Sequence, residues 1–404
     1  MIANKIIKEQ DGRLGKQGEI FDCDSGEVVR DSISFERMRS RRPPFLIVQC
    51  GMGVDSIAML ILLKSEGIRP DVILFSNVGV EFQATYDYIP ILKNWLAEND
   101  FPELTIVSAE RERDSNLEAH CLRLGIFPSI SYRVRHTCSI AWKIEVCNKY
   151  LESQMFFQVA VKSGRSIARA VGFEFGEEAR VDRAIKTVAK KTAAKIQETG
   201  QETSRNQSLI GGDKKSDKAC RNGMSFAIED GIFSAWFPLI EKQMTRNDCA
   251  ELIKKEGLSV PHKSSCTFCA AMKRAERIEL ERTEPHKFFR HLVLEEIVRQ
   301  NEVVPHPVIR GLDFGDAWLD MEIAQKYHGH LNRAIKLFGL ERREADGRRR
   351  GTAWKPKRDR VELFLAAFAT PQLLADFMRT GDVAAEFQVS PVSGVETELQ
   401  AGLF

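Results

Sequence analysis

The chain has 404 residues, enough for two domains or for one large domain with appendages. With 43% hydrophobic and 29% charged residues, its composition is typical of a soluble globular protein, and its net charge of +2 selects no class of partner. The N-terminal stretch MIANKIIKEQDGRLGKQ lacks the apolar core of a signal peptide, and no segment has the roughly 18 uninterrupted apolar residues of a membrane helix. We therefore expect a cytoplasmic protein with no membrane partner.

The first part of the chain predicts a polar extension followed by a buried strand. Residues 1–44 are polar and end in ERMRSRRPP, which predicts a small N-terminal extension, with a hairpin as one form it could take. Residues 45–49, FLIVQ, form a short apolar run, and helical spacing begins at 57–63 after the turn GMGVDS. The predicted order is strand, loop, helix.

The GMGVDS turn has the properties of a phosphate-binding loop. Gly51 and Gly53 let the backbone approach a ligand closely. Asp55 and Ser56 open the helix, where unpaired N–H groups and the positive end of the helix dipole face the loop. The turn matches neither GxxxxGK(S/T) nor GxGxxG with an acidic residue about 20 positions further on. An ordinary strand-to-helix turn is the alternative interpretation.

Further strands follow along the chain. Residues 71–79, DVILFSNVG, predict a second buried strand, joined to the first by a right-handed parallel crossover. Ligands of such sheets bind at the carboxyl ends of the strands, which would bring Ser76, Asn77, Gly79 and Glu81 beside the loop. Short apolar runs predict a third strand at 104–107, a fourth ending at Gly172 and a last one at 236–240.

The segment RVRHTCSIAWKIEVCNKYL predicts a helix from Cys138 onward. Ile140, Ile144, Cys147 and Leu151 fall on one face, so we expect Cys147 to be a packed core thiol. Lys143 lies off that stripe, where it is either solvated or a charge partner for a triphosphate.

Two later regions contrast in composition. Residues 185–224 are polar with almost no large apolar side chain, which predicts a mobile insertion or a lid that orders on binding. Then Thr245 predicts the cap of a helix that Gly257 ends, and Cys266 and Cys269 form a CxxC pair. In a reducing compartment such a pair is typical of a metal site or a redox dithiol.

Five segments, in order over about residues 45–275, resemble one protein family. GMGVDS resembles the SGGxDS loop of the PP-loop ATP pyrophosphatases, with Cys50 and Met52 as departures. LFSNVGVEFQATYDYI, RVRHTCSIAWK and GFEFGEEAR resemble segments of phosphoadenosine phosphosulfate reductases, with Asn77 for the usual Asp. The CxxC block from 233 onward resembles a module of phage and bacterial reductase-like proteins, with Ala270 where a Pro is common. The chain is thus identified as a reductase-like member of the ATP pyrophosphatase superfamily, similar also to the ATP pyrophosphatase component of DNA phosphorothioation.

The resemblance implies an α/β fold with a parallel five-stranded Rossmann-like sheet, in a nucleotide-binding domain at 45–280 with the CxxC module at 262–272. The residues on either side of it predict an N-terminal extension at 1–44 and a mostly helical, basic C-terminal region at 281–404. The implied reaction is adenylation by ATP with Mg²⁺: a substrate oxygen attacks the α-phosphorus, pyrophosphate leaves, and sulfur enters the activated position.

The resemblance also implies roles for particular residues. Asp55, Lys143 and Arg180 would be catalytic, orienting the loop, retaining Mg²⁺ and offsetting phosphate charge. The nucleotide site would comprise Cys50, Gly51, Met52, Gly53, Asp55, Ser56, Asn77, Gly79, Glu81, Gly172 and Glu177. A zinc ion or an iron–sulfur cluster would be held by Cys138, Cys249, Cys266 and Cys269, with His262 as a substitute ligand. The alternative for Glu177 and Arg180 is a turn with a solvated ion pair.

Three functions remain open from the sequence. The first is the ATP-dependent modification of tRNA, DNA or a nucleotide, with the basic stretch 341–360 contacting nucleic acid and a cysteine desulfurase as a possible sulfur donor. A solvated linker is the alternative interpretation of that stretch. The second is a sulfonucleotide reductase. Such enzymes carry a catalytic cysteine in a C-terminal tail, and the absence of a cysteine after Cys269 counts against this function. The third is a degenerate nucleotide-binding module of a phage or defence system.

Overall fold

The structure, a computed structural model, divides the chain into two compact units. It describes residues 19–21, 28–31, 33–109, 111, 114–127, 137–177, 233–269, 272–300, 321–341 and 358–388. Unit 1 comprises Met1–Ala109 and Thr137–Ser265, and unit 2 comprises Glu110–His136 and Cys266–Phe404. The division after Ser265 falls inside the predicted nucleotide-binding domain. The predicted insertion at 185–224 lies outside the described residues.

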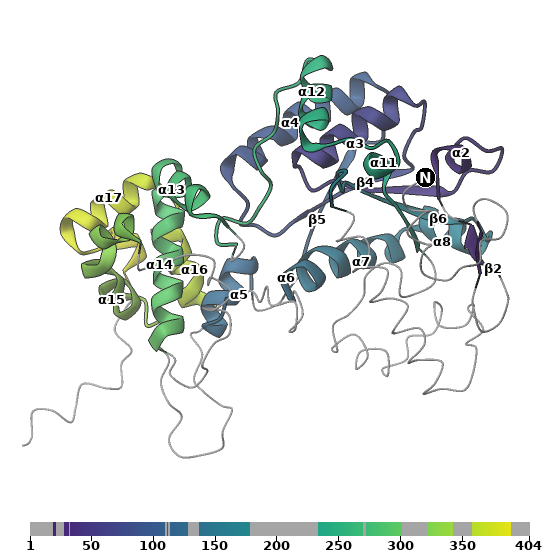
Figure 1. Ribbon diagram of the computed structural model, residues 1–404. Helices are drawn as coiled ribbons and strands as arrows, with labels where there is room; N and C mark the ends of the chain where they lie inside the picture. Colours follow the sequence, from purple (N-terminus) through teal and green to yellow (C-terminus); the bar gives the residue numbers. More distant parts are fainter. Residues whose placement is uncertain are drawn as a thin grey trace, which may run out of the picture. The chain divides into compact units, whose positions relative to one another are not determined.

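Unit 1 is built on a sheet of five parallel strands, which confirms the predicted fold class (Figure 1). The strands are β3 (Phe45–Gln49), β4 (Val72–Asn77), β5 (Leu104–Ser108), β6 (Ile167–Val171) and β7 (Phe233–Trp236), in the order β5-β4-β3-β6-β7. A separate antiparallel hairpin pairs β1 (Glu19–Phe21) with β2 (Val28–Asp31) in the N-terminal extension.

The central strand β3 is buried on both faces, as its apolar sequence predicts. Its Val48 pairs in register with Ile73 of β4 on one side and Ala170 of β6 on the other. Since all three strands are parallel, their carboxyl ends meet at one edge of the sheet. The segments that follow these strands are therefore brought together at that edge.

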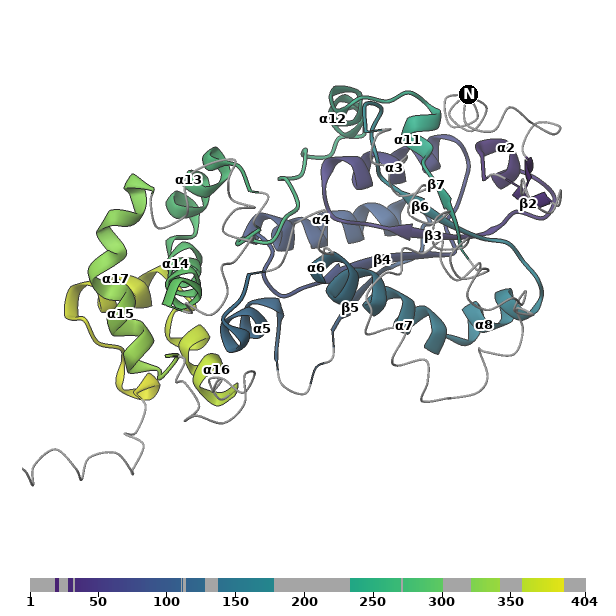
Figure 2. The ribbon, with the colours of Figure 1, turned by 60° about the horizontal axis from the view of Figure 1, so that its bottom comes forward.

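Helices cover both faces of this sheet, as Figures 1 and 2 show. One face carries α3 (Val54–Ser65), α4 (Gln83–Glu98) and α12 (Arg246–Lys255), and the other carries α7 (Glu145–Ser153) and α8 (Met155–Lys162). The short elements of unit 1 are α2 (Phe35–Met38), α6 (Thr137–Ser139), the π-helix η1 (Ile140–Ile144) and α11 (Pro238–Glu241).

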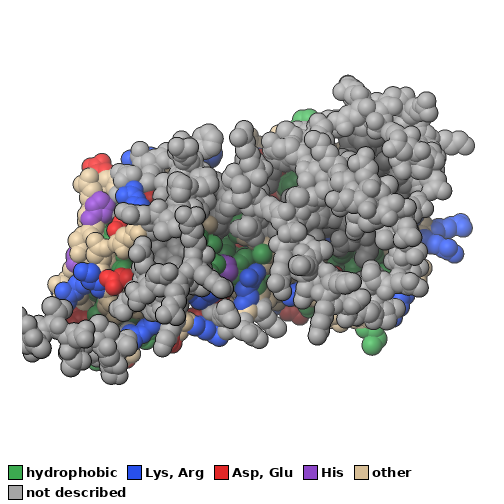
Figure 3. Space-filling model, turned by 90° about the horizontal axis from the view of Figure 1, so that it is seen from below, with side chains coloured by type: hydrophobic (Ala, Val, Ile, Leu, Met, Phe, Trp, Pro, Cys, Tyr) green, Lys and Arg blue, Asp and Glu red, His purple; other side chains and the backbone are tan. Residues whose placement is uncertain are grey.

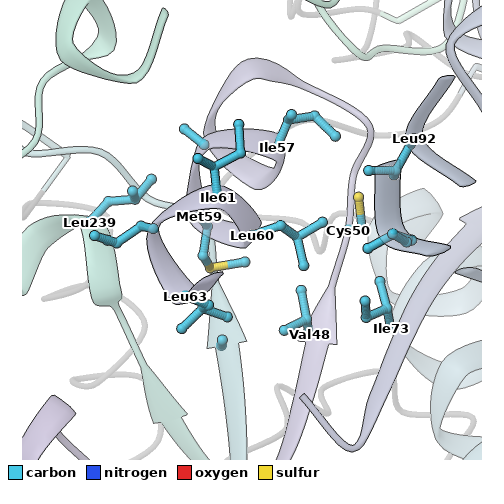
Figure 4. Close-up of a cluster of buried hydrophobic side chains, with 14 of the residues drawn as sticks. Val48, Cys50, Ile57, Met59, Leu60, Ile61, Leu63, Ile73, Leu92 and Leu239 are labelled. Carbon is cyan, nitrogen blue, oxygen red and sulfur yellow. The ribbon is translucent and has the colours of Figure 1, made fainter. Parts of the chain in front are cut away.

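Unit 1 has an apolar cluster on each face of the sheet, and the larger one lies on the α3 side. Nine consecutive or nearly consecutive side chains of α3 are buried because the helix is covered on its outer side as well. Figure 4 shows Val48 and Ile73 of the sheet facing Leu60 of α3. On the opposite face Cys147 is 2% exposed, packed with Leu151 and Phe157, which confirms the prediction of a core thiol.

The predicted last strand is present, but its predicted bounds, 236–240, are wrong. The strand β7 ends at Trp236, and Pro238 begins the short helix α11. Proline has no N–H to give to a strand ladder, but it fits the first turn of a helix, where that N–H would have no partner. The helix predicted after Thr245 is confirmed as α12, with Gly257 in the left-handed conformation after its end.

Unit 2 is helical, as predicted for the C-terminal region. Its elements are α5 (Leu117–Leu124), α13 (Arg274–Thr283), α14 (Pro285–Gln300), η3 (Glu322–Tyr327), α15 (His328–Leu337), α16 (Arg358–Ala367), α17 (Pro371–Thr380) and η4 (Ala385–Phe387). The core surrounds α14, whose Phe289 packs on Phe368 and Phe377 at ring distances of 4.9 and 5.9 Å. Within the described residues, no single helix is long and apolar enough to span a membrane; α16 and α17 reach that length only as a pair bent by 94°.

Candidate nucleotide site

The loop after β3 adopts the backbone of a glycine loop, although one glycine is replaced by methionine. The backbone N–H of Cys50 donates to the Leu74 carbonyl at 2.8 Å and so extends the pairing with β4. Met52 then has φ 61°, in the left-handed region that glycine usually occupies. Its side chain is fully buried, so apolar burial offsets the conformational cost, which is of order 1–3 kcal/mol.

The loop leads into α3 through a hydrogen bond that Ser56 makes with the N-cap residue. Gly53 is the N-cap, and its N–H donates to Ser56 Oγ at 3.1 Å, while that hydroxyl donates to the Gly53 carbonyl at 2.9 Å. The Ser56 hydroxyl therefore stabilises the loop itself. Gly51 is exposed, and a Cβ added there would meet nothing within 4 Å. Open space beside the backbone at Gly51 is where a phosphate could approach.

Two other segments come close to the start of α3. A Cβ on Gly172, just after β6, would lie 3.1 Å from the backbone of both Asp55 and Ser56. Only glycine therefore permits β6 to end so close to the loop. Gly53 lies near Ser264, whose Cβ would be 3.5 Å from a Cβ at that position.

Asp55 opens α3, and its carboxylate forms an ion pair with Arg246 of α12. Arg246 Nη1 donates to Asp55 Oδ2 at 2.5 Å, and the two side chains are 44% and 21% exposed, respectively. Thr245 caps α12, and its Oγ1 accepts from the Asp248 N–H at 3.4 Å. The capped helix start holds the backbone of Arg246 beside the loop.

The segment after β4 forms a turn around Asn77. Asn77 Oδ1 accepts from the Gly79 N–H at 2.8 Å and from the Tyr86 hydroxyl at 3.0 Å, and Gly79 has φ 80°. An aspartate could accept the same two bonds, so asparagine preserves the turn and removes its charge.

A buried carboxylate follows this turn and has a cationic partner. Glu81 is fully buried, and its Oε1 lies 3.1 Å from Nζ of Lys143, whose side chain is 38% exposed. Lys143 belongs to η1, which is joined to the end of β4 by a hydrogen bond from Ser76 Oγ to the Trp142 carbonyl at 2.8 Å. Single-turn π segments are frequent at functional sites. The structure thus brings Lys143 and Glu81 together.

Two predicted cysteines are buried in the core of unit 1. Cys50 is 2% exposed, with its Sγ 3.8 Å from Met52 Sδ, and burial raises the pKa of its thiol to about 11. Only the backbone of Cys50 can face a nucleotide. Cys249 is fully buried against α3, and burial, followed by the charges of Asp55 and Glu174, raises its pKa to about 12.

The CxxC pair lies on a turn of unit 2. Cys266 and Cys269 are half-buried, and the Cys269 N–H donates to the Cys266 carbonyl at 3.0 Å. Phe268, between them, is fully buried and packs on His291 with ring centroids 5.0 Å apart. This contact anchors the turn to the core of unit 2. Cys138 is half-buried in unit 1.

The described residues offer a pair of thiols at this turn and not a complete ligand set. No group of three or more His, Cys, Asp or Glu side chains that could hold a metal ion occurs within the described part of the chain. His262, the predicted substitute ligand, packs its ring on Phe82 at 4.9 Å, and its Nδ1 lies 3.0 Å from the Lys263 carbonyl.

The remaining predicted residues lie at the end of the described segment after β6. The Glu177 N–H donates to the Glu174 carbonyl at 3.1 Å, in a turn that follows Gly172. Arg180 lies outside the described residues. Sequence reasoning missed Arg246, Ser264 and Tyr86 as parts of the site, although Arg246 belongs to the quoted CxxC block.

Comparisons with known proteins add a weak structural likeness. No family model matches the chain, and no curated protein matches it. Among solved structures, the chain is similar to the U34-tRNA thiolase NcsA from Methanococcus maripaludis with its [4Fe-4S] cluster, at 16% identity and a TM-score of 0.33. The match covers 77% of this chain and 97% of that chain. A likeness at this level assigns no role to any residue here.

Proposed function

We propose that the chain is an ATP pyrophosphatase, which adenylates a nucleic-acid or nucleotide acceptor and releases pyrophosphate as a step in sulfur incorporation. The observation that carries the proposal is the loop after β3: Met52 keeps the left-handed backbone of a glycine, and Gly51 is open to a ligand. The helix start at Asp55 lies at the carboxyl edge of the sheet, where such folds bind ligands.

The reaction needs positioning and charge compensation more than it needs a protein nucleophile. An acceptor oxygen attacks the α-phosphorus of ATP, and the bond from that phosphorus to the bridging oxygen breaks, with the electron pair leaving on pyrophosphate. The N–H groups of the first turn of α3 would bind the phosphates. Asp55 would bind Mg²⁺, which neutralises the leaving group. Lys143 and Arg180 would offset the remaining phosphate charge.

We keep the CxxC pair as the proposed metal site. Two thiolates on one turn suit zinc or an iron–sulfur cluster, and either group needs ligands beyond this pair. The residue pair would hold the group in place, and no step of the adenylation passes through it.

The proposal of a nucleic-acid acceptor rests on a basic stretch of the sequence, most of which lies outside the described residues. On the face seen in Figure 3, the described Lys and Arg side chains form separate groups, some of which lie beside Asp and Glu. The basic stretch 341–360 contains nine Lys and Arg residues, and most of it lies outside the described residues. It would contact the phosphates of tRNA or DNA.

The test is pyrophosphate release from ATP by the purified full chain, with tRNA, DNA or a nucleotide added in turn. Asp55→Ala should abolish release and leave the fold intact, because Asp55 lies in the first turn of α3 and is not part of the apolar core. Asp376→Ala, which removes a carboxylate from a surface pair with Arg379 in unit 2, is the matched control. Normal turnover by Asp55→Ala would refute the assignment. Thiol-dependent sulfite release would indicate the reductase instead, and ATP binding without turnover a binding module.

A further inference from the structure

The ion pair between Asp55 and Arg246 connects the phosphate-binding loop to a helix far away in the sequence. The two residues are 191 positions apart, and the donor–acceptor distance is 2.5 Å. Arg246 is the first residue of α12, and the exchange of hydrogen bonds between Thr245 and Asp248 fixes that first turn. The backbone of Arg246 is therefore held beside the loop.

Packing keeps α12 in place beside the loop. Cys249 and Ile253 of α12 are both fully buried in the core that α3 shares. Just before α12, the Met244 carbonyl accepts from the Phe175 N–H at 2.7 Å, which joins this helix to the segment after Gly172. The loop, the segment after β6 and the start of α12 thus form one connected framework.

The pair remains accessible to a ligand. The side chain of Arg246 is 44% exposed and that of Asp55 is 21% exposed, so a ligand can reach the pair from the Arg246 side. A triphosphate with its Mg²⁺ carries a partner for each member. The Asp55 carboxylate can coordinate the Mg²⁺ ion through an oxygen. The phosphate oxygens can accept hydrogen bonds from the N–H groups of the planar Arg246 guanidinium.

We propose that Arg246 is a further substrate-binding residue of this site. It neutralises Asp55 before nucleotide binds, and it transfers to the phosphate oxygens of a nucleoside triphosphate when Asp55 turns to the accompanying Mg²⁺. The site should therefore bind the Mg²⁺-bound triphosphate more tightly than the metal-free triphosphate. The metal-free form carries no cation that could take the place of Arg246 beside the Asp55 carboxylate. The inference rests on the proposed function and names a residue and a substrate form for the same site.

The experiment is calorimetric titration of the full chain with ATP, once with Mg²⁺ and once with EDTA. Arg246→Ala should weaken binding of Mg²⁺-ATP about 10- to 100-fold, the range for a lost hydrogen bond to a charged group. Arg246→Lys should give an intermediate affinity, because lysine keeps the charge but loses the fork geometry. Lys254→Ala removes a cation from the other end of α12, where it pairs with Glu251 at 2.8 Å, and should leave the affinity unchanged.

Metal-free ATP gives the more specific test. Asp55→Asn should raise the affinity for ATP in EDTA by about 10-fold, because Arg246 is released and a repelling charge is removed. The double variant Asp55→Asn with Arg246→Ala should lose the part of that gain that the released Arg246 contributes. If the double variant keeps the full gain, or if Arg246→Ala binds Mg²⁺-ATP like the parent chain, the inference is overturned while the proposed function stands. If the parent chain binds no ATP under either condition, the proposed function itself is overturned.

Discussion

Gly172 provides a direct test of how the loop is held. A Cβ at this position would lie 3.1 Å from Asp55 C and Ser56 N and 3.2 Å from Asp55 O, whereas carbon contacts are optimal at about 3.5–4.0 Å. The crowded atoms belong to the backbone of α3, so no side-chain rotation relieves them. Overpacking of this kind costs about 1–3 kcal/mol. Gly172→Ala should therefore lower the free energy of unfolding by that amount, and it should weaken ATP binding by displacing the first turn of α3.

The assay is urea unfolding of the full chain, followed by tryptophan fluorescence, to which the buried Trp95 and Trp236 of unit 1 contribute. Gly51→Ala is the control, because a Cβ there meets nothing within 4 Å and the backbone is not left-handed. The Gly51→Ala variant should unfold at the same urea concentration as the parent chain, or its free energy of unfolding should rise by about 0.4–1 kcal/mol. Such a rise would come from the lower conformational entropy of the unfolded chain with alanine in place of glycine. A Gly172→Ala variant as stable as the parent chain would show that α3 yields to the added carbon, and the close-contact argument would be wrong.

Two further predictions concern unit 2. Cys266→Ser or Cys269→Ser should lose bound zinc or iron in elemental analysis of anaerobically purified protein. Cys147→Ala should retain the metal, since that thiol packs in the core of unit 1 and is not a predicted ligand. Full metal occupancy in both serine variants would exclude the pair. Burial, with the charges of Arg290 and Lys287, lowers the pKa of His286 to about 4, so the unfolded chain binds its proton first and stability should fall as pH drops from about 6.5 towards 4. The urea midpoint at pH 5 and pH 7 measures this loss, and a His286→Gln variant with an undiminished pH dependence would contradict it.

The local elements of unit 1 could be predicted because their signals are local. The apolar run 45–49, the cap at Thr245 and the glycine loop each depend on residues next to one another in the chain, and the structure contains β3, α12 and the loop there. The run at 236–240 misled because apolar composition alone does not separate a strand from a short helix, and Pro238 decided in favour of the helix.

The sequence by itself determined the parallel sheet and the loop at its carboxyl edge, because apolar periodicity and glycine placement act over a few residues. Only the tertiary structure decided which side chains meet there. Asp55 and Arg246 lie 191 positions apart, Gly172 is required by the backbone of α3, and Cys249 points into the core. These outcomes depend on how α12 and β6 pack against α3, and packing between distant segments leaves no periodic pattern in the sequence.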